Sequence, residues 1–123
     1  MLKESTEQTQ KGLLSIDQMM ARILDIKSVK DLEAKVVNSK KPVVIFCMAK
    51  WCNTSKQLLP TILERYSMEH ELWDLAFLDI DVDAKLTSAL KIDKVPSVML
   101  AYQGNIIDGF KGLVAQAEID KFF

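Results

Sequence analysis

Residues 49–64 read AKWCNTSKQLLPTILE, and this stretch decides the fold. Residues 43–49, VVIFCMA, form a continuous apolar run, which is typical of a strand buried on both faces of a sheet. A helix is expected from about residue 52 to residue 69, and Pro60 inside it should kink it. Apolar residues recur at helical spacing in this segment, at Leu58, Leu59, Ile62 and Tyr66. Cys52 therefore stands where a buried strand passes into a helix.

Strands and helices alternate on both sides of this stretch. The apolar spacing predicts, in chain order, strand 22–26, helix 29–37, strand 43–49, helix 52–69, strand 75–81, a helix capped by Asp83, strand 97–102, turn 103–105, strand 106–110 and helix 115–123. Such an order is typical of an α/β protein with a mixed central sheet and helices on both faces. The 123 residues, of which 49% are hydrophobic, suffice for one domain with one packed core.

An N-terminal extension, residues 1–21, precedes the domain, which spans residues 22–123. The extension begins with a polar tail, and helical spacing then predicts a short amphipathic helix over 13–21 that starts with a capping box of Ser15 and Gln18. A helix this short is marginal in water on its own. We therefore expect a partner protein to hold it, with packing onto the domain's own surface as the alternative. The expected anchors are Leu13, Leu14, Ile16, Met19 and Met20.

Composition excludes several kinds of partner. The net charge of −1 gives no electrostatic footprint for nucleic acid, and no apolar run approaches the roughly 20 residues of a membrane span. The N-terminus lacks the apolar core of a secretory signal and is too acidic for a transit peptide. The alternating Asp79, Asp81 and Asp83 are expected to form a strand end and a helix cap. We expect His70 to be solvated, and we expect no metal site and no cofactor.

The chain has two cysteines, Cys47 and Cys52. If residues 43–48 form a strand, the two Cα atoms lie about 16 Å apart along the extended chain. A disulfide needs Cα atoms within about 7 Å. We therefore expect Cys47 to be a small core residue and any disulfide of Cys52 to join it to another molecule. A reducing compartment is the expected setting.

A second stretch, KVPSVMLAYQGNIIDGFKG at residues 94–112, stays in register with the first. In these stretches the chain resembles the thioredoxin family, without gaps from Trp51 to Gly112, and the resemblance covers about residues 22–123. It implies the thioredoxin fold, with Val95-Pro96 as a cis-proline turn that faces the cysteine. It also implies a groove for a partner or substrate protein. The groove residues carried over are Trp51, Asn53, Thr54, Val95, Pro96 and Gly112.

The resemblance makes Cys52 the candidate nucleophile. A helix N-terminus stabilises a thiolate, and the Cys52 thiolate could attack a disulfide. A second thiol must resolve the mixed disulfide that results. The family's resolving cysteine is replaced here by Ser55, whose hydroxyl cannot attack sulfur but can donate a hydrogen bond to the thiolate.

Other departures from the family pattern lie close to this site. The two residues between the redox positions, usually Gly-Pro, are Asn53 and Thr54. The family's buried aspartate and its lysine partner, which assist proton transfer, fall at Phe46 and Phe77. Burying one of these charges without the other is costly, so their joint loss makes physical sense.

Three functions remain open from the sequence. The first, which we favour, is a non-catalytic binding or accessory subunit of a larger assembly, such as a mitochondrial respiratory complex. The second is a monothiol redox protein in which Cys52 forms mixed disulfides with protein or glutathione thiols. The third is an active thioredoxin with an engineered Ser55, which leaves Phe46 and Phe77 unexplained. We expect no dithiol oxidoreductase activity, while monothiol exchange stays open.

The compartment is inferred from the resemblance alone. VVNSKKPVV at residues 36–44 and FKGLVAQAEIDKF at residues 110–122 are most similar to mitochondrial-type thioredoxins. The resemblance therefore implies a mitochondrial location, with the cytoplasm as the alternative.

Overall fold

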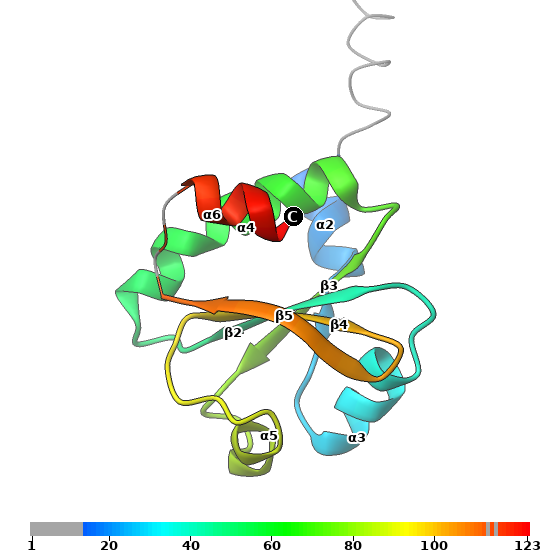
Figure 1. Cartoon of the computed structure of the whole chain (residues 1–123), viewed down its shortest axis with the longest axis vertical. Helices are drawn as coiled ribbons and strands as arrows, with labels where there is room; N and C mark the ends of the chain where they lie inside the picture. Colours follow the sequence, from blue (N-terminus) through cyan, green and yellow to red (C-terminus); the bar gives the residue numbers. More distant parts are fainter. Residues whose placement is uncertain (1–13, 113, 115) are drawn as a thin grey trace, which may run out of the picture.

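A computed structural model of the chain describes residues 14–112, 114 and 116–123. It forms a five-stranded sheet in the order β1-β3-β2-β4-β5 (Figure 1). The strands are β1 (Leu24–Asp25), β2 (Val43–Met48), β3 (Asp74–Asp79), β4 (Ser97–Tyr102) and β5 (Asn105–Lys111). The helices are α2 (Ile16–Arg22), α3 (Val29–Leu32), the π-helix η1 (Glu33–Val37), α4 (Asn53–Glu69), α5 (Ala84–Ala89) and α6 (Gln116–Phe122).

The sheet is mixed, as the sequence predicts. β1 and β2 pair with β3 in parallel, whereas β4 pairs with β2 and with β5 in antiparallel fashion. Helices α2, α4 and α6 lie on one side of the sheet, and α3 and α5 lie on the other (Figure 1). Each face of the sheet has its own hydrophobic cluster. Successive side chains of β2 alternate between the two clusters, which explains why its sequence is continuously apolar.

Several helices and strands begin or end at other residues than the sequence predicts. The strand expected over 22–26 is only Leu24–Asp25, because α2 extends to Arg22. The helix expected over 29–37 changes at Glu33 to a π-helix. The predicted caps are confirmed: Ser15 and Gln18 form a capping box, and the Asp83 carboxylate accepts a hydrogen bond from the Lys85 N–H.

The described part of the extension, residues 14–21, packs on the chain's own domain, which corrects the expected role of Met19 as a partner anchor. Met19 is 6% exposed and belongs to the cluster beneath α4, and Leu14 packs against the same cluster. Met19 is therefore a core residue and cannot anchor a partner. Ile16 and Met20 lie outside the core, with 67% and 48% of their surface exposed. Leu13 lies outside the described residues.

The expectation of a solvated His70 is also wrong. His70 is 8% exposed at the C-terminal end of α4. The Arg22 guanidinium lies 3.3 Å from His70 Nδ1, and Lys41 Nζ donates to the His70 carbonyl over 3.2 Å. Side chains from two distant segments, Arg22 of α2 and Lys41 before β2, therefore contact this histidine.

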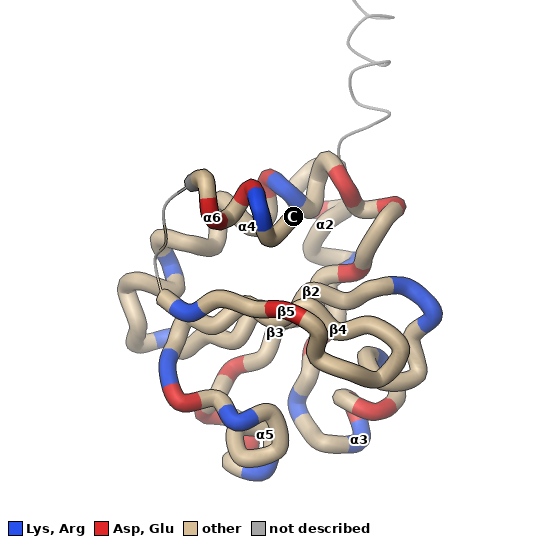
Figure 2. Tube along the Cα trace, viewed as in Figure 1, with Lys and Arg blue, Asp and Glu red and all other residues tan. Residues whose placement is uncertain are grey.

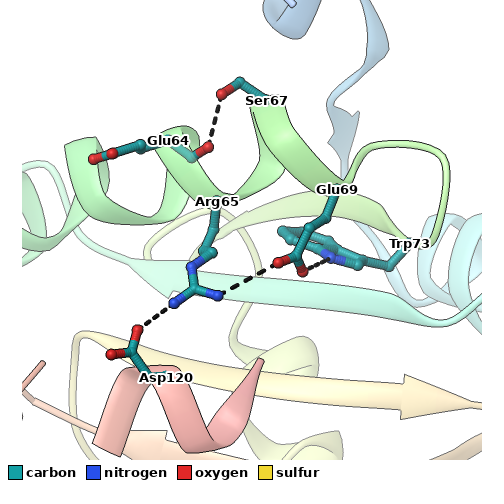
Figure 3. A network of polar contacts seen from close by, with 6 residues as sticks. All are labelled: Glu64, Arg65, Ser67, Glu69, Trp73 and Asp120. Carbon is teal, nitrogen blue, oxygen red and sulfur yellow. Dashed lines mark hydrogen bonds and ion pairs between the residues drawn. The ribbon is translucent and has the colours of Figure 1, made fainter. Parts of the chain in front are cut away.

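A polar network connects α4 with α6, two helices that are far apart in the sequence (Figure 3). Arg65 bonds with Glu69 at 3.4 Å and with Asp120 of α6, and Glu69 accepts a hydrogen bond of 3.0 Å from the Trp73 indole. The network fixes α6 over the sheet beside α4. Elsewhere acidic and basic residues are interspersed along the trace, in keeping with the net charge of −1 (Figure 2).

Candidate functional site

Cys52 occupies the N-cap position of α4, at the carboxyl end of β2. Its N–H donates to the Ala49 carbonyl over 3.1 Å, which turns the chain out of the strand. Its own carbonyl then accepts from the Lys56 N–H at 3.4 Å, which opens the helix. The cysteine side chain is partly exposed and is positioned by backbone hydrogen bonds on both sides of it.

The cis-proline turn lies against the cysteine. Val95-Pro96 is cis, as the resemblance implied, and Cys52 Sγ lies 3.8 Å from the Val95 carbonyl oxygen. The carbonyl of Pro96 in turn accepts a hydrogen bond of 2.7 Å from the N–H of Gly112. Gly112 has a φ of 72°, a left-handed conformation that favours glycine. The cysteine therefore lies against the cis-proline turn, and Gly112 holds that turn in place through the Pro96 carbonyl.

Trp51 forms one wall of the site. It is 66% exposed, and its indole Nε1 donates to Asp81 over 2.8 Å. A groove of about 320 Å³ runs beside it, lined by Trp51, Ile80, Ile92, Asp93, Lys94 and Val95. The sequence reading assigned Asp81 to a strand end and missed this contact. The signal was its position at the carboxyl end of the predicted strand 75–81, the edge of the sheet where the predicted helix that carries Cys52 also begins.

The surroundings of Cys52 favour a thiolate. The pKa of Cys52 is lowered, first by hydrogen bonding from the Ser55 side chain and backbone and then by smaller contributions from Thr54. Ser55 itself is 3% exposed. Its hydroxyl has no hydrogen-bond partner among the described residues, and it can donate to the sulfur when Cys52 ionises.

The second cysteine is chemically different. Cys47 is fully buried in β2, and burial raises the pKa of its thiol to about 12. Both cysteines are free, as the chain geometry predicted. Cys52 is therefore the accessible thiol of the pair, and Cys47 is the core residue that the sequence predicts.

The base of the site is apolar. Phe46 of β2 and Phe77 of β3 are direct register partners, and both pack in the cluster beneath α4. The resemblance described above places the family's buried aspartate and its lysine at these two positions. Asn53 is exposed and Thr54 is half-buried in the first turn of α4, so both flank the cysteine. Within residues 14–112, 114 and 116–123, no group of three metal-ligating side chains is present.

The fold and the site together define an α/β protein with a single accessible cysteine at the head of a long helix, facing a cis-proline turn. The thioredoxin family profile matches residues 24–123, and the chain belongs to the thioredoxin family. It is 31% identical to a probable thioredoxin-2 of Caenorhabditis elegans over 102 residues, which is 83% of this chain and 70% of that protein.

Other relatives and a solved structure agree. The chain is 29% identical to mitochondrial thioredoxin of Mus musculus over 80% of its length and 59% of the mouse protein. It is 28% identical to the Bos taurus mitochondrial thioredoxin over 95% of its length and 76% of that protein. The crystal structure of Malassezia sympodialis thioredoxin has the same fold, with a TM-score of 0.70 and 22% identity over 80% of this chain and 84% of that one.

Proposed function

We propose that this protein is a monothiol thioredoxin that binds partner proteins in the groove beside Trp51 and joins to them through Cys52. The observation that carries the proposal is the pairing of a partly exposed, low-pKa thiol with a hydroxyl at the resolving position. The sequence alone favours a purely non-catalytic role. The lowered pKa of Cys52 shifts the balance, because an inert leftover thiol needs no stabilised thiolate.

The proposed reaction is one half of thiol–disulfide exchange. The Cys52 thiolate attacks one sulfur of a partner disulfide, so a new S–S bond forms as the old one breaks. The departing thiolate leaves with the electron pair and takes a proton from solvent. Ser55 cannot complete the second exchange, so the mixed disulfide persists until an external thiol, such as glutathione, attacks it.

A specific observation also favours the accessory-subunit role as a second candidate. The contact between Phe46 and Phe77 replaces the charged pair that assists proton transfer in the family. A protein that only binds its partners needs no such pair. In this second candidate function the protein belongs to a multi-subunit assembly, and the assembly forms without Cys52.

The relatives also bear on the compartment that we propose. Similarity to mitochondrial thioredoxins of mouse and cow supports a mitochondrial location, and the cytoplasm remains the alternative. Within the described residues, no helix has both the length and the apolar character to cross a membrane.

The two candidates are separated by one pair of measurements on the wild type and Cys52→Ala. The reduced proteins are treated at neutral pH with an aromatic disulfide, and the thiol released is followed by absorbance. A monothiol protein releases one equivalent rapidly, and Cys52→Ala releases none because Cys47 is buried. Affinity purification of the tagged proteins then reports assembly. Equal assembly of both variants, with no rapid exchange, supports the accessory role and overturns the first.

A dithiol assay completes the test. With thioredoxin reductase and insulin, the wild type is expected to give no turnover above a blank that contains only the thiol reductant. Turnover above that blank contradicts the proposed monothiol chemistry.

A further inference from the structure

The Ser55 hydroxyl is a buried polar group that the fold leaves without a partner. Among the described residues it is the buried side-chain oxygen or nitrogen with no hydrogen bond, on a residue that is 3% exposed. Native proteins rarely leave such a group unpaired, so its position calls for an explanation. Ser55 is the third residue of α4 and Cys52 is its N-cap, so the hydroxyl lies within one helical turn of the thiol, whose pKa it lowers.

Cys52 Sγ stands between donors and an acceptor. The hydroxyl and N–H of Ser55, with those of Thr54, offer hydrogen bonds from the α4 side. The Val95 carbonyl oxygen lies 3.8 Å away on the side of the cis-proline turn. A thiolate can use the donors but leaves the carbonyl unmatched. The neutral thiol already donates to that carbonyl but leaves the Ser55 hydroxyl without a partner. An S–O–H group adds an acceptor oxygen for that hydroxyl and keeps a hydrogen to donate.

We propose that Cys52 is a modification site for hydroperoxides, at which it becomes a sulfenic acid held between Ser55 and the Val95 carbonyl. The inference rests on the same thiolate as the proposed function. The Cys52 thiolate attacks the terminal peroxide oxygen, and the S–O bond forms as the O–O bond breaks. The departing hydroxide or alkoxide takes a proton from solvent. Sulfur loses two electrons and the peroxide gains them.

The chain supplies no thiol that would consume this sulfenic acid. In an ordinary thioredoxin the cysteine three residues on would condense with it at once, whereas here that position is Ser55. Cys47 is fully buried and, on β2, packs in the cluster on the opposite face of the sheet from Phe46. The sulfenic acid therefore persists until a partner thiol displaces its oxygen, which yields a mixed disulfide and water. Oxidation thus gives the protein a way to capture a reduced partner.

The test uses the full chain with hydrogen peroxide and dimedone, a carbon nucleophile that labels sulfenic acids, read by mass spectrometry of the tryptic peptides. We expect one label, on Cys52, and none in Cys52→Ala. In Ser55→Ala the label should form on the order of threefold to tenfold more slowly, because one hydrogen bond to the thiolate is lost. In Ser55→Cys the label should give way to a disulfide between positions 52 and 55. Absence of a label on wild-type Cys52 overturns the inference, as does an unchanged rate in Ser55→Ala.

Two controls separate the possible failures. Ser55→Ala removes an unpaired buried hydroxyl, so it should fold with an unchanged or higher urea midpoint; if it does not fold, the wild type and Cys52→Ala still decide the matter. Exchange of Cys52 with an aromatic disulfide, without peroxide, tests the proposed function alone. Rapid exchange without peroxide labelling overturns this inference and leaves the proposed function standing.

Discussion

Phe46 and Phe77 face one another across the β2–β3 pair, with ring centroids 5.7 Å apart and ring planes at 61°. Phe46 is 1% exposed, so the contact forms part of the core beneath the cysteine. An edge-on aromatic pair of this kind contributes about 0.5–1.5 kcal/mol beyond the burial of its surface. The site is therefore supported by packing where the family has a buried charge pair.

A buried charge at this place should be poorly tolerated. Phe46→Asp is expected to lower the free energy of unfolding by about 3–5 kcal/mol, because it strands a carboxylate and removes a packed ring. Phe46→Asp combined with Phe77→Lys should recover part of that loss, since the lysine pairs with the carboxylate. Urea denaturation of the three variants measures both effects. A double variant no more stable than Phe46→Asp alone would contradict a shared site for the two positions.

Restoring the second cysteine alone should give a poor enzyme. Ser55→Cys places a thiol at the resolving position, so oxidation is expected to join positions 52 and 55 in a disulfide. Insulin reduction with thioredoxin reductase should stay well below that of an ordinary thioredoxin, because Phe46 and Phe77 provide no proton relay. The matched control adds Phe46→Asp and Phe77→Lys to Ser55→Cys. Full activity from Ser55→Cys by itself would show that the charge pair is unimportant here.

The fold and the position of Cys52 were predictable from the sequence because they depend on local patterns. The run from Val43 to Met48 predicts a buried strand, and a cysteine before an amphipathic segment predicts a thiol at a helix N-terminus. The misses involve contacts between distant segments. From the sequence His70 is predicted to be exposed, but in the structure Arg22 of α2 contacts it. Asp81 is predicted only as part of a strand end, but it accepts a hydrogen bond from the indole of Trp51. The periodicity of residues within one helix or strand does not predict contacts between distant segments.

The buried thiol of Cys47 should lower the free energy of unfolding at high pH. Its pKa in the folded protein is about 12, against 9.0 for a free thiol, so the folded state keeps the proton while the unfolded chain loses it. The contribution is thus fully present below pH 9.0 and is lost as pH rises towards about 12. At about 1.4 kcal/mol per pKa unit, the loss reaches about 4 kcal/mol.

The measurement is the free energy of unfolding from about pH 8 to about pH 11 for the wild type and Cys47→Ala. Tyr66, whose pKa is also raised by burial, remains in both proteins and cancels in the difference. The wild type should lose stability more steeply than Cys47→Ala. Parallel curves would mean that the Cys47 thiol ionises as easily in the folded state as in the unfolded chain.

Substitution of two adjacent methionines tests which side of α2 stabilises the fold. Met19 is 6% exposed in the cluster beneath α4, whereas Met20 is 48% exposed. Met19→Ala should therefore lower the free energy of unfolding by about 2 kcal/mol, at the lower end for a buried methionine because α2 is peripheral. Met20→Ala, the matched control, should change it by less than about 0.5 kcal/mol. Urea denaturation measures both, and equal small effects would mean that α2 is not part of the cooperative unit and that Met19 is available to a partner after all.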